Sequence, residues 1–174
     1  MEKKLELIRP DETWEEAVME YRAEFLRCGS SLDGGAGLEK AASFPEWLRS
    51  LRENSCEETV RAGLVPASTF LAVRREDGRL VGMIDIRHRL NEYLLRFGGN
   101  IGYSVRPSER RKGYATEMLA LALEECRALG MERVLLTCDR GNTASARTML
   151  RNGAVLENEI QEEARITQRY WILL

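Results

Sequence analysis

The stretch from Asn100 to Gly130, NIGYSVRPSERRKGYATEMLALALEECRALG, constrains the fold of this chain more than any other feature. It begins as a β-rich run, passes three cations and a glycine, and enters a long helical pattern that Gly130 ends. The apolar run ERVLLTCD follows directly. A strand, a helix and a second strand in this order predict a crossover unit, in which the helix packs on a face of a sheet.

Hairpin and helix signals surround this unit. Asp77-Gly78 separates two β-rich runs, and VLENEIQEEARITQRYWILL indicates a terminal hairpin. Helical spacing predicts two helices, in DETWEEAVMEYRAEFLRC and PEWLRSLRENSC, and a short third helix in GNTASARTMLRNGA. We expect the glycine-rich connection between the first two to be a mobile surface loop or a lid over a substrate site. The predicted order is β-α-α-β-β-β-α-β-α-β-β, an α/β (α+β) fold with a single mixed, mostly antiparallel sheet and helices on both faces.

Composition limits the class of protein. The chain has 174 residues, which predicts a single domain over residues 1–174. Its net charge of -2 provides no global attraction for nucleic acid or an anionic membrane, so we expect neither as a partner. The four cysteines are scattered without metal-ligand spacing, which predicts no metal site and is typical of a reducing cytoplasm.

The basic turn RRKGYA, Arg110–Ala115, allows two interpretations. A helix that begins near Gly113 leaves its first N–H groups unpaired, and these groups together with the helix dipole attract phosphate. Gly113 lets a ligand approach the backbone because it has no Cβ. An ordinary solvated turn between a strand and a helix has the same composition. The turn alone leaves both interpretations open.

Its neighbours carry a family resemblance. Arg110-x-x-Gly113-x-Ala115 resembles the acyl-CoA pyrophosphate loop of the GCN5-related N-acetyltransferase (GNAT) family, whose pattern is Gln/Arg-x-x-Gly-x-Gly/Ala. The run IGYSVRPSERRKGYA is similar to a bacterial predicted-acetyltransferase branch of that family, and the match extends over about residues 100–154. The resemblance implies transfer of an acetyl group from acetyl-CoA to a primary amine by direct attack in a ternary complex. It also implies a small-molecule or peptide amine as the acceptor, and a homodimer is compatible with it.

The resemblance also implies where acetyl-CoA binds. The expected cofactor-binding residues are Tyr103, Ser104, Val105, Arg110, Arg111, Lys112, Gly113, Tyr114, Ala115, Thr116, Asn142 and Ser145. The strand residues would hydrogen-bond the pantetheine amides, and the turn would hold the pyrophosphate. The N–H of Val105 would stabilise the developing oxyanion, which can contribute about 3 kcal/mol. Asn142 has an alternative role as the N-cap of the following helix.

Two positions depart from the family pattern. Met149 stands where many members have a tyrosine that protonates the leaving thiolate, and Gly98-Gly99-Asn100 lacks the usual glutamate base. An alkylammonium must still lose a proton before it attacks. We expect His88 as the base and Tyr103 as the acid. The alternatives are Asp85 or Glu92 for the base and Tyr170 for the acid, and catalysis by positioning alone is also open.

A second class of function stays open. The missing tyrosine and glutamate are also compatible with a non-catalytic acyl-CoA-binding or regulatory domain. Turnover with an amine distinguishes the two, because a binding domain takes up acetyl-CoA without releasing CoA. A nucleotide-phosphate enzyme is disfavoured because no Gly-Lys-Ser/Thr follows the turn.

Overall fold

The computed structural model describes residues 3–174. Its strands are β1 (Leu5–Ile8), β2 (Ala67–Arg74), β3 (Leu80–Arg87), β4 (Ile101–Val105), β5 (Arg133–Asp139), β6 (Val155–Glu162) and β7 (Arg165–Leu173). Its helices are α1 (Glu15–Arg27), α2 (Phe44–Glu53), α3 (Tyr114–Ala128) and α4 (Thr143–Arg151). The predicted order of helices and strands is confirmed.

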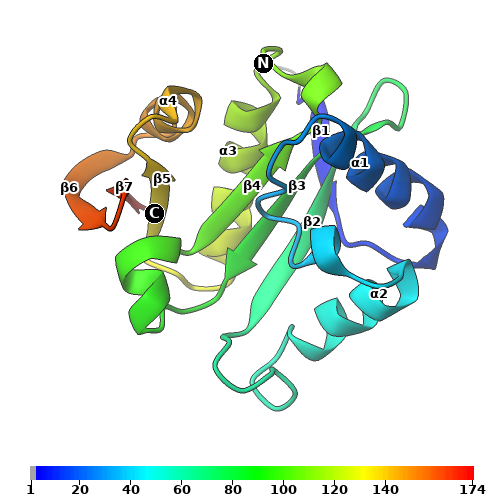
Figure 1. The fold of residues 1–174 in the computed structure, drawn as a ribbon, viewed down its shortest axis with the longest axis horizontal. Helices are drawn as coiled ribbons and strands as arrows, with labels where there is room; N and C mark the ends of the chain where they lie inside the picture. The colour runs from blue at the N-terminus through cyan, green and yellow to red at the C-terminus, as the bar shows by residue number, and fades with distance from the viewer. Residues whose placement is uncertain (1–2) are drawn as a thin grey trace.

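The strands form two antiparallel sheets. The larger has the order β1-β2-β3-β4 and the smaller has the order β5-β7-β6. The predicted mostly antiparallel architecture with helices on both faces is confirmed: α1 and α2 lie together on one face of the larger sheet, and α3 packs on the other (Figure 1). One detail of the prediction needs correction, because the hydrogen-bonded ladders divide between β4 and β5 and do not form a single mixed sheet.

Asn100 joins the two sheets at the point where they divide. Its N–H donates to the carbonyl of Leu135 at 2.6 Å, and its side-chain oxygen accepts the N–H of Leu135 at 2.8 Å. On the other side, its carbonyl accepts the N–H of Arg87 at 2.7 Å and its Nδ2 donates to the carbonyl of Arg87 at 3.1 Å. Beyond Asn100, β4 continues along β3 while β5 pairs with β7. The hydrogen bonds of Asn100 therefore connect β3 to β5 at the point where no continuous ladder joins the two sheets.

The register of β4 decides which of its backbone groups are free. Arg106 N donates to Val81 O at 2.8 Å, and Arg87 N donates to Asn100 O at the other end of the ladder. Because hydrogen bonding alternates along an antiparallel pair, the N–H groups of Gly102 and Ser104 point toward β3. Those of Tyr103 and Val105 point to the opposite edge of β4, which is the edge that faces the division between the sheets.

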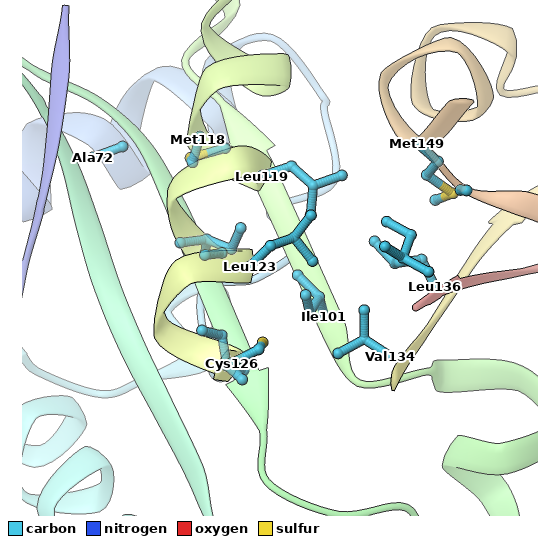
Figure 2. Close-up of a cluster of buried hydrophobic side chains, with 14 of the residues drawn as sticks. Ala72, Ile101, Met118, Leu119, Leu123, Cys126, Val134, Leu136 and Met149 are labelled. Carbon is cyan, nitrogen blue, oxygen red and sulfur yellow. The ribbon is translucent and has the colours of Figure 1, made fainter. Parts of the chain in front are cut away.

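The largest cluster of buried apolar residues lies beneath α3. Leu119 and Leu123 of this helix pack beside Ile101 of β4, with Val134 and Leu136 of β5 on the far side (Figure 2). Their burial fixes β4, α3 and β5 as one unit despite the break in hydrogen bonding. A second cluster holds α1 and α2 against the other face of β2 and β3.

The glycine-rich connection between α1 and α2 differs from the prediction of a mobile loop. Leu32 and Leu38 within it are buried, and the indole N–H of the buried Trp47 donates to Gly35 O at 2.8 Å. Gly34 has a φ of +71°, and a Cβ there would lie 2.4 Å from the carbonyl oxygen of Gly102. The glycine thus allows the connection to pack directly on the backbone of β4.

Candidate active site

The basic turn before α3 offers a ligand its backbone N–H groups more than its cationic side chains. Arg111 and Gly113 have φ values of 65° and 85°, and α3 begins directly afterwards at Tyr114. The first bond of the helix runs from Glu117 N to Gly113 O, so the preceding helical N–H groups have no partner within α3. A Cβ on Gly113 would meet nothing within 4 Å, which leaves room for a ligand at this end of the helix. This arrangement fits a phosphate.

Two of the three cations of the turn are tied to the protein. Arg110 donates to Val105 O at 3.1 Å and to Ser30 Oγ at 2.8 Å, and its guanidinium lies 5.7 Å from the ring centroid of Phe25. We expected Arg110 at the cofactor, but in the structure it connects the turn to β4 and to the start of the glycine-rich connection. Lys112 Nζ lies 2.7 Å from Glu109 Oε2.

A buried carboxylate that the sequence analysis missed supports the turn. Glu109 is 6% exposed and pairs with Arg74 at 2.9 Å and Arg79 at 3.1 Å in addition to Lys112. The hydrogen bond from Lys112, together with Arg74, holds the pKa of Glu109 below its usual value against the effect of desolvation. Arg74 also donates to the hydroxyl of Tyr114 at 3.1 Å, so the ring of Tyr114 faces this cluster and only its backbone faces the turn. The sequence feature that could have identified Glu109 is an acidic residue with cations on both sides of it.

The free edge of β4 contains two of the three expected strand residues. The N–H groups of Tyr103 and Val105 are directed to this edge, as the pantetheine interaction requires. Ser104 is a correction: its backbone N–H faces β3, and its hydroxyl lies 3.0 Å from the buried hydroxyl of Tyr21. Ser104 therefore fixes α1 to the sheet, and an alternating strand cannot present all three residues to one ligand.

Tyr103 and Ser145 meet across the division between the sheets. The two hydroxyl oxygens are 2.7 Å apart, which brings β4 and α4 together at the expected site. Burial raises the pKa of Tyr103 to about 12, so its phenol is protonated at neutral pH. Asn142 caps α4, because its Oδ1 accepts the N–H of Ser145 at 3.1 Å. The alternative role of Asn142 as an N-cap is thus confirmed.

The other residues considered for the acid are structural in their surroundings. Met149 is 1% exposed and points from α4 toward Leu136 (Figure 2). Tyr170 is buried, and its hydroxyl donates to Gln168 Oε1 at 2.8 Å. Tyr103 is therefore the phenol nearest to the free edge of β4 among the candidates.

His88 lies far from this edge. Tyr103 pairs with Ile84, four residues before His88, which corresponds to about 13 Å along the strand. His88 Nε2 instead lies 2.8 Å from Ser68 Oγ, and partial burial lowers its pKa. The structure separates His88 from the place where we expected it to act, because His88 lies past the end of β3 at Arg87, beyond the last pair of the ladder between β3 and β4, Ile86 with Ile101.

A pocket of about 630 Å³ opens on the α1 and α2 face of the larger sheet. Asp85 and Thr69 belong to its lining, together with Trp47 of α2 and Ala36 of the glycine-rich connection. Asp85 is 4% exposed and accepts a hydrogen bond from Thr69 Oγ1 at 2.8 Å. Among residues 3–174 no group of three or more potential ligands gathers for a metal ion, and no helix has the length and apolarity to cross a membrane.

Comparison with known proteins agrees with this geometry. Residues 14–155 match the family described as an acetyltransferase (GNAT) domain. The chain thus belongs to the GNAT acetyltransferase family, and the predictions of the family, of an acetyl-CoA-dependent N-acetyltransferase and of acetyl-CoA as acyl donor are confirmed at the family level. No curated protein sequence matches the chain.

Solved structures show the same fold at low identity. An acetyl transferase from Salmonella typhimurium, described as modifying the N-terminal serine of ribosomal protein L7/L12, is 18% identical with a TM-score of 0.69, covering 99% of this chain and 96% of its own. A RimL L7/L12 acetyltransferase in complex with coenzyme A is 18% identical with a TM-score of 0.71 over the same shares. A dodecameric spermidine N-acetyltransferase from Vibrio cholerae is 16% identical with a TM-score of 0.66, covering 99% of this chain and 95% of its own.

Proposed function

We propose that the protein transfers an acetyl group from acetyl-CoA to a primary amine, with the acyl donor bound along the free edge of β4. The observation that carries this proposal is the continuity between two sets of free backbone N–H groups. Those of Tyr103 and Val105 lie on one edge of β4, and the strand leads directly to the open turn before α3. An extended pantetheine arm with a pyrophosphate at one end fits such a surface.

The residues of the turn have separate tasks in this proposal. The backbone from Arg111 to Thr116 would hold the pyrophosphate, and the left-handed conformation at Gly113 turns the chain so that these N–H groups converge. Glu109 keeps the turn in place through its three cations. Arg111 has its guanidinium at an exposed position and would add charge from the solvent side.

The chemical step needs a polarised carbonyl and a protonated leaving group. The backbone N–H of Val105, or that of Tyr103 on the same edge, would donate to the carbonyl oxygen as negative charge develops there. The nitrogen of the neutral amine forms a bond to the carbonyl carbon, the bond between carbon and sulfur breaks, the nitrogen gives up a proton to solvent and the sulfur takes one. The Tyr103 hydroxyl is the nearest proton source that we can name, and Ser145 orients it.

A test of the proposal measures thiol release with a panel of amines. Wild-type protein should release CoA in proportion to the acetylated amine that forms, and this release should require the amine. Acetyl-CoA binding without amine-dependent release would instead identify a binding or regulatory domain. Failure to bind acetyl-CoA at all would remove the assignment of the β4 edge.

A further inference from the structure

The glycine-rich connection between α1 and α2 lies against β4 and carries one acidic side chain to the free edge of that strand. Arg110, the first residue of the basic turn beyond β4, donates to Ser30 Oγ at 2.8 Å. Further along the connection, a Cβ on Gly34 would lie 2.7 Å from the Cα of Tyr103. The connection is thus held to the strand at two points, and residues 31–33 between them lie along β4 (Figure 1).

Burial decides the direction of each side chain in this stretch. Leu32 is buried in the cluster that holds α1 and α2 against the larger sheet. Ser31 and Asp33 on either side of it are exposed, and Ser31 Oγ donates to Asp33 Oδ2 at 3.1 Å. Both side chains therefore point away from the cluster. Because Leu32 and Gly34 are buried on both sides of Asp33, the backbone that carries this carboxylate has a fixed position.

The negative charge of Asp33 is available to a ligand. Among residues 3–174, no lysine, arginine or histidine nitrogen lies within 4.0 Å of its carboxylate oxygens. An ionised carboxylate has about four acceptor positions, and Ser31 occupies one of them. The carboxylate can therefore accept further hydrogen bonds from a bound cation.

The same charge acts on the free edge of β4. Burial is the main cause that raises the pKa of Tyr103 to about 12, and the negative charge of Asp33 adds to this effect. The Tyr103 side chain extends across the division between the sheets to Ser145 of α4. Since the energy between two charges falls with their separation, the carboxylate lies close to this division, where the acyl donor would be bound.

We infer that Asp33 binds the ammonium group of the acceptor beside the acyl donor. This inference rests on the proposed acetyl transfer and names the acceptor class, a cationic amine with no carboxylate next to its nitrogen. The Asp33 carboxylate forms a charge-assisted hydrogen bond with an ammonium ion. It repels the α-carboxylate of a free amino acid, which lies directly beside the nitrogen. Alkylamines, polyamines and the N-terminus of a peptide all belong to the favoured class.

The bound ammonium must change its protonation state before the nitrogen attacks. An alkylamine is an ammonium ion at neutral pH, so this is the form that Asp33 binds. The nitrogen then loses one proton, which the exposed carboxylate passes to solvent. The neutral amine that results has no charge-assisted bond to Asp33 and is free to move to the carbonyl carbon of the donor. Asp33 therefore acts mainly on the binding of the acceptor.

The first experiment compares acceptors with the wild-type protein. The probes are tyramine, the peptide amide Tyr-Gly-Gly-NH₂, spermidine and free L-tyrosine, each with saturating acetyl-CoA. The best of the first three should have a kcat/KM at least about tenfold above that of L-tyrosine, the loss expected from one like-charge contact. Tyramine or spermidine as the best acceptor would identify a small alkylamine, and the peptide amide would identify a peptide N-terminus. L-Tyrosine as the best of the four overturns the inference.

The second experiment changes the charge of the connection without touching the donor site. Asp33→Asn keeps the size of the side chain and should raise KM for the best amine about tenfold, with a smaller change in kcat and an unchanged Kd for acetyl-CoA. It should also lower the preference for tyramine over L-tyrosine about tenfold, because the attraction and the repulsion are lost together.

Glu39→Gln is the matched control for this change. Glu39 is an exposed acid of the same connection, in the 3-10 helix η2 (Leu38–Lys40), and its carbonyl accepts a hydrogen bond from Arg22 of α1 at 3.1 Å. The variant removes the same charge from a segment that is tied to α1, so KM and the preference for tyramine should stay as in the wild type. Thermal melting checks that both variants are folded.

The outcomes separate this inference from the function on which it rests. Wild-type protein that binds acetyl-CoA but acetylates no amine contradicts the proposed function itself. Active wild-type protein with an unchanged KM and an unchanged preference in Asp33→Asn contradicts the role of Asp33 alone. An equal loss of activity toward tyramine and L-tyrosine in folded Asp33→Asn also contradicts it, because a structural role would affect both acceptors alike.

Discussion

The proposed donor site and the pocket on the α1 and α2 face of the larger sheet are built in opposite ways. The donor site, β4 with the turn before α3, offers backbone N–H groups whose directions depend on register and on two positive φ angles. The pocket is lined by side chains from separate segments, among them the buried carboxylate of Asp85. Backbone recognition depends on a short contiguous motif, whereas the pocket depends on residues far apart in the sequence. Substitutions should therefore act on the donor site mainly through the shape of the backbone and less through charge.

The largest effect should come from Gly113→Val. A branched side chain at a φ of 85° is strained, and its Cβ would occupy the open space in front of the first N–H groups of α3. Acetyl-CoA binding measured by calorimetry should fall by more than about 100-fold, the loss expected when two or more charge-assisted bonds are removed.

Gly130→Val is the matched control for this change. Gly130 ends the same helix with a φ of +76°, and a Cβ there also meets nothing within 4 Å. It should cost stability for the same reason and leave acetyl-CoA affinity unchanged. Equal loss of affinity in both variants would show that strain, and not the position of the turn, explains the first result.

Asn100→Ala tests the residue that joins the two sheets. The change removes the acceptor of the Leu135 N–H and the donor to the Arg87 carbonyl in a position that is 3% exposed. Two buried groups without partners should lower the free energy of unfolding by about 3 kcal/mol, which urea denaturation would measure. Asn142→Ala removes an exposed N-cap and should cost only about 1 kcal/mol. Similar losses of unfolding free energy in the two variants would argue against Asn100 as the residue that holds the two sheets together.

Tyr103→Phe separates chemistry from binding. If the phenol protonates the leaving sulfur, kcat should fall about 10- to 100-fold with no change in the Kd for acetyl-CoA. Since burial raises the pKa of Tyr103 to about 12, its ionisation should not reduce the wild-type rate anywhere below about pH 11. Met149→Leu is the control and should retain nearly full activity, because this side chain packs only in the apolar core. An unchanged kcat in Tyr103→Phe would indicate solvent as the proton source.

Lys112→Ala should have the smallest effect of this series. Its ammonium is half exposed and already paired with Glu109, so its removal should weaken acetyl-CoA binding less than about fivefold. The loss should shrink as salt is added. A larger loss than in Gly113→Val would reverse the comparison and make charge the main determinant of the turn.

The sequence by itself determined the order of elements and the position of the turn before α3. Arg110-x-x-Gly113-x-Ala115 after a strand identified the turn, because the position of a glycine relative to a helix start is local information. The same is true of the hairpin at Asp77-Gly78 and of the N-cap at Asn142. Local signals of this kind need no knowledge of distant contacts.

Only the tertiary structure decided which side chains share a site. It placed Asp85 at a pocket and His88 outside it, although the two are close in sequence. Pairing with β4 and packing of α2 fix the face of β3 that Asp85 occupies, and His88 lies past the end of that strand. It also turned Ser104 toward Tyr21 and gave the junction of the sheets to Asn100. These outcomes depend on register and on contacts between residues far apart in the chain, which a pattern of residue types along one strand does not contain.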